Sequence, residues 1–276
     1  ISYLDQYIEL PQETSVLDFL FEELKKEHLD EDQASNQVRT ILAQLELTNE
    51  INSHINQLSG GQKQRLIIAK SLILNPTLLL LDEPFSNLDN LLRKQLLSEL
   101  FDFFKTKDLT IIWITHNTEE ALSFSDRIAL LNYGKLQQIG SPQEIYLTPA
   151  NLFTAKFFTE SNLIPSKLES ADEENIYFKL FKHTFKIHKP HSFKVITADE
   201  KQDILVIIHP ESIIIDDSGY FTGQVLSQQF RGAVTRLEIQ LNETTLIAET
   251  SSHKFIPRDI VNFNIDAKSI HCLSQI

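Results

Sequence analysis

LLLLDEP, residues 78–84, joins four leucines to Asp82, Glu83 and a proline. An apolar run of this length is typical of a buried strand, and acids directly after it would lie where the strands of an α/β sheet end and ligands bind. In a nucleoside triphosphatase the first acid of such a pair holds Mg²⁺ and the second polarises the attacking water. A strand that ends in two solvated carboxylates would show the same pattern, so the surrounding sequence has to decide.

Helical and strand patterns alternate on both sides of this run. Apolar residues at helical spacing indicate helices, and short apolar runs bounded by turn residues indicate strands. The expected helices are residues 15–26, 30–47, 61–74, 90–105 and 118–125, and the expected strands are residues 77–81, 109–115, 128–131 and 135–139. The last two strands flank Asn132-Tyr133-Gly134, which is a hairpin signal. This alternation predicts a parallel α/β sheet up to about residue 150.

The pattern changes beyond residue 150. Short alternating runs with little helical periodicity predict an all-β module, a small OB-like barrel. These runs are residues 176–181, 184–187, 204–208, 223–228, 235–241, 246–249 and 260–265. We therefore expect two domains, residues 1–162 and 163–276, with a helical subdomain over about residues 12–75 in the first.

The composition argues against several classes of protein. A formal net charge of −13 argues against a protein that coats nucleic acid or an anionic lipid surface. No run approaches the roughly 18 apolar residues of a membrane-spanning helix, and the residues after Ile1 lack the basic region of a signal peptide. The single cysteine, Cys272, rules out an internal disulfide and fits a reducing compartment such as the cytosol.

Two of the seven glycines are adjacent, Gly60 and Gly61, and stand between Ser59 and Gln62 at the start of an expected helix. Such a turn directs free N–H groups and the positive end of the helix dipole at one point. The missing side chains also let a phosphate approach the backbone. An ordinary helix start with Ser59 as its N-cap would use the same residues, so this turn too depends on its context.

The order and spacing of these sites strongly resemble the ATP-binding cassette (ABC) family. Gln6 corresponds to the Q-loop, Leu58–Gln62 to the LSGGQ signature, Asp82-Glu83 to Walker B, Ser86–Asp89 to the D-loop and His116 to the H-loop. The resemblance continues through roughly residues 1–150, and the combination of LSGGQ with LLLLDEP at this spacing is specific. It implies a P-loop NTPase cassette whose ligands are ATP and Mg²⁺.

The resemblance implies a catalytic or metal-binding role for four residues. Asp82 would hold Mg²⁺ through water, and Glu83 would be the general base for the attacking water. His116 would form a hydrogen bond with the γ-phosphate. Gln6 would sense the metal ion and the γ-phosphate and relay their state to a transmembrane partner.

The family also acts as a dimer, which the resemblance implies for this chain. Two copies would associate head to tail, so that Ser59, Gly60, Gly61 and Gln62 contact the γ-phosphate of the ATP that the partner binds. Asp89 would contact the opposite subunit.

The largest departure from the family lies ahead of the Q-loop. The family places a strand, a glycine-rich Walker A loop with its lysine, a helix and an adenine-stacking aromatic residue there, and this sequence contains none of them. A strand, loop and helix take about 30 residues. We therefore expect an N-terminal truncation of at least that length, in agreement with the first residue, Ile1, and the absence of methionine. We also expect the chain alone to hold ATP poorly.

The second half is similar to the TOBE-like β-barrel that follows the cassette in importer ATPases for sugars, polyamines, ferric iron, sulfate or molybdate. The likeness rests on His209-Pro210-Glu211, Gly223-Gln224-Val225, Phe230-Arg231-Gly232 and Ile270-His271. It departs at His209, where the family usually has arginine. The implied function is the ATP-hydrolysing subunit of an ABC importer, peripheral on the cytoplasmic face of the plasma (inner) membrane. Its partners would be transmembrane permease subunits and a second copy of itself, not nucleic acid.

Two other functions stay open at this point. One is a soluble ABC protein of the ribosome-associated type, which Tyr3-Leu4-Asp5-Gln6 weakly resembles, although such proteins usually carry two cassettes in one chain. The other is a non-catalytic fragment that acts only as a binding or regulatory module. ATPase activity that depends on membrane subunits would favour the importer.

Overall fold

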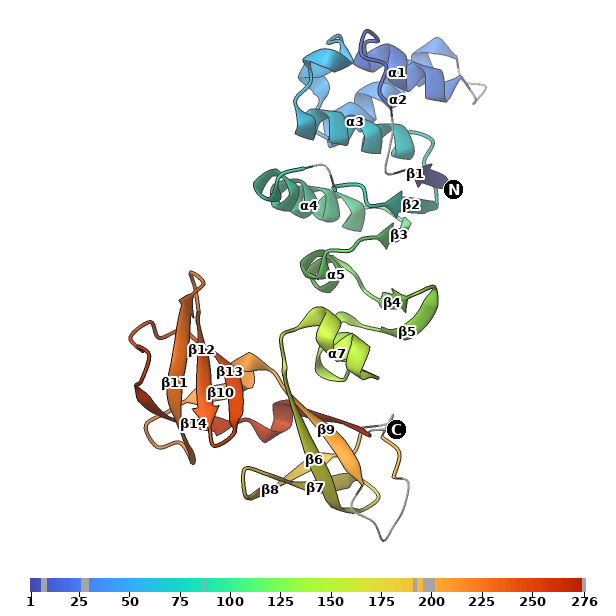
Figure 1. Cartoon of the computed structure of the whole chain (residues 1–276). Helices are drawn as coiled ribbons and strands as arrows, with labels where there is room; N and C mark the ends of the chain where they lie inside the picture. Colours follow the sequence, from blue (N-terminus) through green and yellow to red (C-terminus); the bar gives the residue numbers. More distant parts are fainter. Residues whose placement is uncertain (6–8, 26–29, 87, 191–192, 196–201, 275–276) are drawn as a thin grey trace. The chain divides into compact units, whose positions relative to one another are not determined.

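The computed structural model describes residues 1–5, 9–25, 30–86, 88–190, 193–195 and 202–274 (Figure 1). The chain forms two compact units, Ile1–Asn117 and Thr118–Ile276. The expected domain division between residues 162 and 163 stays a prediction. Within the described ranges, no helix combines the length and the apolar character that crossing a bilayer requires.

The first unit is built on a three-stranded parallel sheet. Its strands are β1 (Ser2–Leu4), β2 (Leu78–Asp82) and β3 (Thr110–Ile114), in the order β1-β2-β3. Leu79 and Leu81 of the central strand are buried, because one face of the sheet packs against the interior of the unit. The predicted parallel α/β sheet is confirmed in these residues, and β1 is a strand that sequence analysis did not predict.

Four helices of the first unit agree with the expected ranges to within a few residues. They are α1 (Val16–Leu24), α2 (Glu31–Gln44), α3 (Gly60–Leu72) and α4 (Asn90–Lys105), with short 3₁₀ turns η1 (Thr48–Glu50) and η2 (Ile55–Gln57) before α3. Asp30 and Ser59 start α2 and α3 with capping boxes, which explains why these helices begin where they do. Helix α4 buries one apolar stripe at helical spacing, made of Leu96, Leu97, Leu100 and Phe104.

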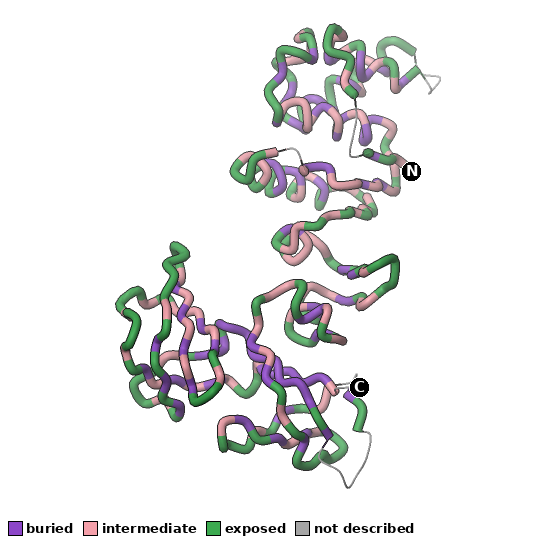
Figure 2. Tube along the Cα trace, viewed as in Figure 1, coloured by how far each residue is buried: buried purple, intermediate pink, exposed green. Residues whose placement is uncertain are grey.

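Apolar residues on the other face of this sheet are partly exposed, and Figure 2 colours the trace of the chain by burial. Tyr3, Leu80 and Ile112 are register neighbours across the three strands. Tyr3 is 56% exposed and Ile112 is 54% exposed, and Ile114 beyond it is 55% exposed. Parallel sheets are normally covered on both faces, so this face has the character of a surface that another element covers.

The second unit begins as the sequence predicts and then adds two short helices. Helix α5 (Thr118–Phe124) precedes the antiparallel hairpin of β4 (Ile128–Asn132) and β5 (Lys135–Gly140). The two turn residues, Tyr133 and Gly134, have φ angles of 46° and 72°, and a type I′ hairpin turn requires positive φ at both positions. Helices α6 (Pro142–Leu147) and α7 (Leu152–Phe158) follow and were not predicted.

Two five-stranded antiparallel sheets make up the rest of the second unit. Their strand orders are β10-β14-β11-β12-β13 and β15-β9-β6-β7-β8. The strands are β6 (Asn162–Ala171), β7 (Asn175–Leu180), β8 (His183–His188), β9 (Asp203–Ile208), β10 (Ile213–Ile215), β11 (Phe221–Phe230), β12 (Thr235–Leu241), β13 (Thr244–Thr250), β14 (Ile260–Ile265) and β15 (Ile270–Ser274), with 3₁₀ turns η3 (Pro210–Ser212) and η4 (Ala267–Ser269). The predicted change to β structure in the second half is confirmed.

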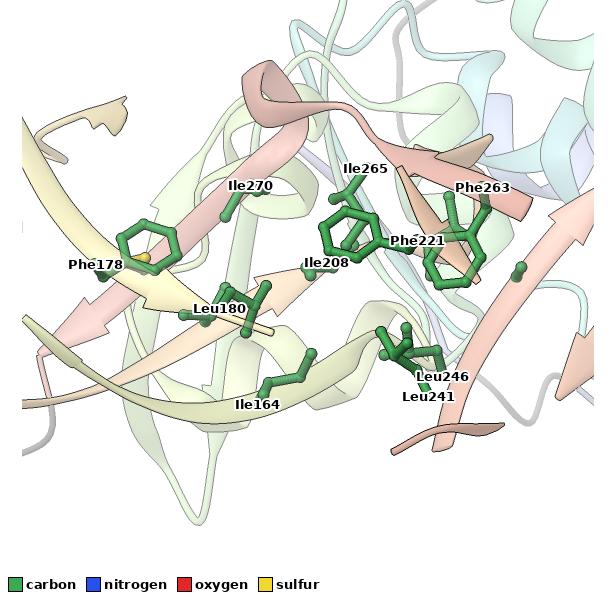
Figure 3. Packing of buried hydrophobic residues seen from close by; sticks show 14 of the residues in the cluster. Ile164, Phe178, Leu180, Ile208, Phe221, Leu241, Leu246, Phe263, Ile265 and Ile270 are labelled. Atoms are coloured by element: carbon green, nitrogen blue, oxygen red, sulfur yellow. The ribbon is translucent and has the colours of Figure 1, made fainter. Parts of the chain in front are cut away.

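Side chains from both sheets share one apolar core (Figure 3). Phe178 of β7 and Phe263 of β14 are fully buried in it, and the ring of Phe221 stacks on Phe263 with centroids 5.5 Å apart. Strand β9 is buried on both of its faces, because its alternate residues Leu205 and Ile207 contact a second cluster that includes Ala155 of α7. This explains why β9 is a continuous apolar run.

Buried histidines tie α6 and the segment after it to the sheets. The Nε2 atom of His271 lies 3.0 Å from the Pro149 carbonyl oxygen, and the ring of Tyr146 stacks on His209 with centroids 4.4 Å apart. Burial lowers the pKa of His271 to about 4 and also lowers the pKa of His209. Both imidazoles are therefore neutral at pH 7, since an imidazolium would lose its water here.

Candidate functional site

Asp82, Glu83 and His116 meet where two neighbouring parallel strands end. Asp82 is the last residue of β2 and pairs with Ile114, the last residue of β3. The backbone N–H of Glu83 donates to the Ile114 carbonyl at 3.0 Å, which extends the pairing by one residue. The Nδ1 atom of His116 lies 3.0 Å from Oε1 of Glu83. The structure thus brings together the predicted Walker B acids and the predicted H-loop histidine.

Tyr3 adds a hydroxyl group beside the first acid. Its phenol oxygen lies 3.5 Å from Oδ2 of Asp82. Desolvation, together with the carboxylates of Asp5 and Asp82, raises the pKa of the Tyr3 phenol, so the group stays a hydrogen-bond donor at pH 7. Sequence analysis gave Tyr3 no role at this site, because nothing local indicates that β1 pairs with β2.

The backbone at Glu83 is in an unfavourable conformation. Its φ angle is 43°, and a side chain other than glycine in this left-handed region costs about 1 kcal/mol. Hydrogen bonds on both sides hold it there: Glu83 N–H donates to Ile114, and the Glu83 carbonyl accepts from Ser86 N–H at 3.2 Å. With this turn, the Glu83 carboxylate lies beside the His116 ring.

Asp89, the predicted D-loop residue, starts helix α4. Its carboxylate accepts hydrogen bonds from the N–H groups of Leu91 at 3.1 Å and Leu92 at 3.0 Å. Asp89 itself is exposed. Capping of α4 is therefore one function of this carboxylate, and its predicted contact with an opposite subunit stays a prediction.

The predicted signature residues form the first turn of α3. Ser59 Oγ accepts from Gln62 N–H at 3.3 Å, and Gln62 Oε1 accepts from Ser59 N–H at 2.9 Å. The side-chain amide of Gln62 also donates to Glu50 at 2.8 Å. Among the described residues these hydrogen bonds go to each other and to Glu50, not to Asp82, Glu83 or His116. The turn is thus a separate surface from the strand-end site of the same chain.

The two glycines of this turn differ in what surrounds them. A Cβ atom on Gly61 would lie 3.2 Å from Cδ1 of Leu92, so Gly61 lets α3 pack closely on α4. A Cβ atom on Gly60 would meet nothing within 4 Å, and Gly60 is a regular helical residue. Neither the backbone nor the packing of this chain requires glycine at position 60, which fits a close approach from outside the chain.

An open pocket of about 240 Å³ lies beside the signature turn. Arg65, which sequence analysis gave no role, lies at its wall and connects three helices. Its guanidinium donates to the Leu45 carbonyl at the end of α2, forms an ion pair with Glu46 at 2.8 Å, and forms another with Glu99 of α4. The residues that line the pocket are Glu46, Ser59, Gly61, Gln62, Arg65, Leu92, Gln95 and Leu96.

Gln6, the predicted Q-loop residue, lies outside the described residues. The remaining donors fit a magnesium–nucleotide complex in their chemistry. Mg²⁺ in nucleotide sites takes one or two carboxylates together with phosphate oxygens and water, and Asp82 offers a half-exposed carboxylate at the strand end. The open N-terminus of α3 offers the N–H groups that bind a phosphate.

Comparison with known proteins agrees with these features. The model of the protein family described as "ABC transporter" matches residues 1–86, from β1 through the signature turn and the two acids. The spermidine/putrescine import ATP-binding protein of Marinobacter nauticus is 35% identical over 256 residues, which cover 91% of this chain and 66% of that protein. The protein of the same name from Clostridium acetobutylicum is 33% identical over 257 residues, or 91% of this chain and 69% of that protein.

A third relative has the same name and comes from the Aster yellows witches'-broom phytoplasma. It is 38% identical over 211 residues, which cover 76% of this chain but only 49% of that protein. The chain thus spans about half to two thirds of the length of the curated relatives it matches. These matches do not favour the ribosome-associated alternative or the non-catalytic one.

Proposed function

We propose that this chain, which belongs to the family of ABC importer ATP-binding subunits, takes part in binding and hydrolysing ATP to drive solute uptake. The observation that carries the proposal is the contact of 3.0 Å between Glu83 and His116 at the ends of β2 and β3. A carboxylate held beside an imidazole at the ligand edge of a parallel sheet is suited to activating water next to a phosphate.

In the proposed mechanism Glu83 accepts a proton from the attacking water. The αL turn and the Ile114 hydrogen bond hold its carboxylate beyond the strand end, so it faces the space where the γ-phosphate would lie. His116, 69% exposed at its side chain, would contact the γ-phosphate through the ring nitrogen that does not face Glu83. Asp82 and Gln6 would bind the Mg²⁺ ion, which, when bound, neutralises charge on the phosphates.

The signature residues Ser59–Gln62 would serve an ATP bound by a second copy of the chain. Two observations support this head-to-tail dimer. The turn makes its hydrogen bonds away from the chain's own strand-end site. In addition, neither the backbone nor the packing of this chain requires glycine at position 60. A phosphate of the partner's nucleotide would lie against the backbone N–H groups of this turn, and Asp89 would face the partner as well.

A Walker A loop is required in addition to these residues. The seven glycines of the sequence include no Gly-x₄-Gly-Lys pattern, so the β-phosphate would be held by residues outside this sequence. The exposed side chains of Tyr3 and Ile112, on either side of the half-buried Leu80, support this inference, because a helix beside a Walker A strand would cover them. We infer further that the two five-stranded sheets act as the OB-like barrel module of importer ATPases.

The partners would be transmembrane permease subunits, with the chain peripheral on the cytoplasmic face of the membrane. The names of the relatives suggest polyamines, spermidine or putrescine, as the transported solutes. The permease would form the path for the solute. The role of this chain would be to change the state of the permease when two copies close on ATP.

Reconstitution tests this function. The full-length protein, purified with its permease subunits and placed in lipid vesicles, should hydrolyse ATP and take up labelled spermidine only when ATP is present on the side of the ATP-binding subunits. Vesicles that hydrolyse ATP but take up no polyamine would overturn the proposed solute. Absence of ATP hydrolysis in the intact complex would overturn the proposed function.

A mixing experiment tests the head-to-tail dimer. Full-length Ser59→Arg subunits and full-length subunits with a substituted Walker A lysine should each be inactive alone. In mixed dimers one of the two sites contains neither lesion, so a structure of the mixed dimer should show ATP between the intact surfaces of that site. Mixed dimers with no nucleotide at the undamaged site would contradict the contact in trans.

A further inference from the structure

Arg93 of helix α4 turns back onto the loop that precedes the helix. Its Nε–H donates to the Phe85 carbonyl at 3.1 Å, and its Nη2 donates to the Ser86 carbonyl at 3.2 Å and to the Leu88 carbonyl at 3.3 Å. All three acceptors are backbone oxygens between Glu83 and Asp89. One side chain thus serves three carbonyl groups of the loop between Glu83 and α4.

The chemistry of the side chain suits this task. A guanidinium is planar and presents five N–H donors in a rigid fork, and so it can serve several acceptors at once. A lysine in its place would keep the charge but would reach these carbonyls only as a single point donor. The Arg93 side chain is half-buried, and its hydrogen bonds are part-buried as well, so water replaces them poorly if they are lost.

The loop that Arg93 holds is connected directly to Glu83. Ser86 N–H donates to the Glu83 carbonyl, and Leu88 N–H donates to the Phe85 carbonyl at 3.2 Å. The φ angle of Glu83 is 43°, and a backbone in that region persists only where its surroundings over-determine it. Ser86 therefore links the two residues: its carbonyl accepts a hydrogen bond from Arg93, and its N–H donates one to the Glu83 carbonyl.

The loop is also anchored to the sheet through an aromatic contact. Phe85 is 3% exposed, and its ring packs on the Trp113 ring in a T-shaped arrangement with centroids 5.8 Å apart. Trp113 lies on β3 next to Ile114, whose carbonyl accepts from Glu83. Arg93, Phe85 and Ile114 thus hold the turn at Glu83 from three sides.

We propose that Arg93 is a positioning residue: by holding the carbonyls of Phe85, Ser86 and Leu88, it fixes the turn at Glu83 and the start of α4 at Asp89. The inference rests on the proposed function in so far as Glu83 is the general base. Arg93 itself touches neither nucleotide nor water in this role. Its effect on hydrolysis passes through the direction of the Glu83 carboxylate.

The single tryptophan of the chain allows a test that does not depend on activity. Trp113 is the only tryptophan, and it contacts the loop through Phe85. In Arg93→Gln and Arg93→Lys, quenching of Trp113 fluorescence by acrylamide should increase, because the loop opens more often. Lys105→Gln is the matched control, since it removes one positive charge from an exposed side chain at the other end of α4. Unchanged quenching in both Arg93 variants would overturn the proposal.

Hydrolysis by the full-length protein provides the second readout. A mispositioned general base should lower kcat by about tenfold or more while KM for ATP changes little, because the nucleotide is held elsewhere. Arg93→Lys should lose less than Arg93→Gln, and thermal unfolding identifies any variant that fails to fold. If kcat is unchanged in a variant whose loop has loosened, the positioning role is wrong. If the wild-type protein does not hydrolyse ATP, the proposed function fails, and the Trp113 measurement still decides whether Arg93 holds the loop.

Discussion

The imidazole of His116 lies 3.0 Å from the carboxylate of Glu83, although 33 residues separate them in the sequence. They meet because β2 and β3 are parallel neighbours that end in register, Asp82 beside Ile114. The left-handed backbone at Glu83 then turns its side chain toward the histidine. The two residues form a pair because the sheet and the loop after β2 place them at one edge.

Replacing Glu83 by glutamine should stop hydrolysis and leave ATP binding intact. The amide keeps the shape of the side chain but cannot accept the proton, and a general base typically contributes 10²- to 10⁴-fold, so kcat of the full-length protein should fall by roughly that factor. Steady-state ATPase rates and binding of a fluorescent ATP analogue measure the two effects. Asp102→Asn is the control, because it neutralises an exposed carboxylate of α4 that lies 4.0 Å from Lys105. A Glu83→Gln protein with near wild-type turnover would exclude the proposed role.

Replacing Gly60 by alanine should separate stability from activity. A Cβ atom there meets nothing within 4 Å, and alanine is the better helix former by up to about 1 kcal/mol, so the urea midpoint should stay the same or rise. ATPase activity should nevertheless fall by about tenfold or more, because the methyl group stands where a phosphate would approach the backbone.

Gly232→Ala should show the opposite behaviour to Gly60→Ala. Gly232 has a φ of 82° and open space around it, so alanine there strains only the backbone and should lower stability by about 1 kcal/mol. Its ATPase activity should stay near wild type. Equal effects of the two substitutions on activity would contradict the assignment of Gly60 to a phosphate contact.

Acid should destabilise the second unit through its buried histidines. The pKa of His271 is about 4 in the folded protein and ordinarily 6.5. As pH falls from 6.5 to 4 the unfolded chain binds a proton that the folded chain does not, so the free energy of unfolding falls, by about 3 kcal/mol at pH 4. The lowered pKa of His209 acts in the same direction. Urea unfolding at several pH values measures this slope.

The His271→Gln variant provides the control for this pH dependence. Its amide can still donate to the Pro149 carbonyl that lies 3.0 Å from Nε2 of His271, but it does not titrate. The variant should therefore lose part of the pH dependence between 6.5 and 4. An unchanged slope would mean that other groups cause the loss of stability in acid.

The β-rich sheets should fold without the first unit. A fragment of residues 162–276 keeps the core that both sheets share, and should unfold in one cooperative transition. A fragment that starts at residue 142 should be more stable, since it adds the Tyr146 ring on His209 and the Pro149 carbonyl beside His271. Urea midpoints compare the two. An unstructured 162–276 fragment would show that the expected boundary between residues 162 and 163 is misplaced.

Local patterns in the sequence determined much of the first unit. The leucine run before Asp82 predicts β2, and the periodicity of residues 90–105 predicts α4 with the bounds that the structure has. In the second unit, the hairpin through Tyr133 and Gly134 was also predicted. These elements are predictable because helices, strands and hairpin turns depend on side-chain spacing and turn residues over a few positions of the sequence.

Other elements have weak local signals. Strand β10 has only three residues, and β15 mixes His271 and Cys272 with apolar residues, so neither shows a clear alternation. Strand β6 was expected to be a boundary region, but its first half pairs with β9 and its second half with β7. Helices α6 and α7 have six and seven residues, too few for a clear helical period.

For the proposed site, the sequence by itself predicted which residues would carry the chemistry: Ser59–Gln62, Asp82, Glu83 and His116 follow from motif order. Only the tertiary structure decided how they are held. The turn at Glu83 is fixed by Ile114 from another strand and by Arg93 from the helix that follows. In the sequence Arg93 is one polar residue of a helical pattern. Its three acceptors are backbone carbonyls, which every residue has, so no residue type marks them. Which carbonyls it reaches is therefore set by the path of the loop in space, which residue types do not encode locally.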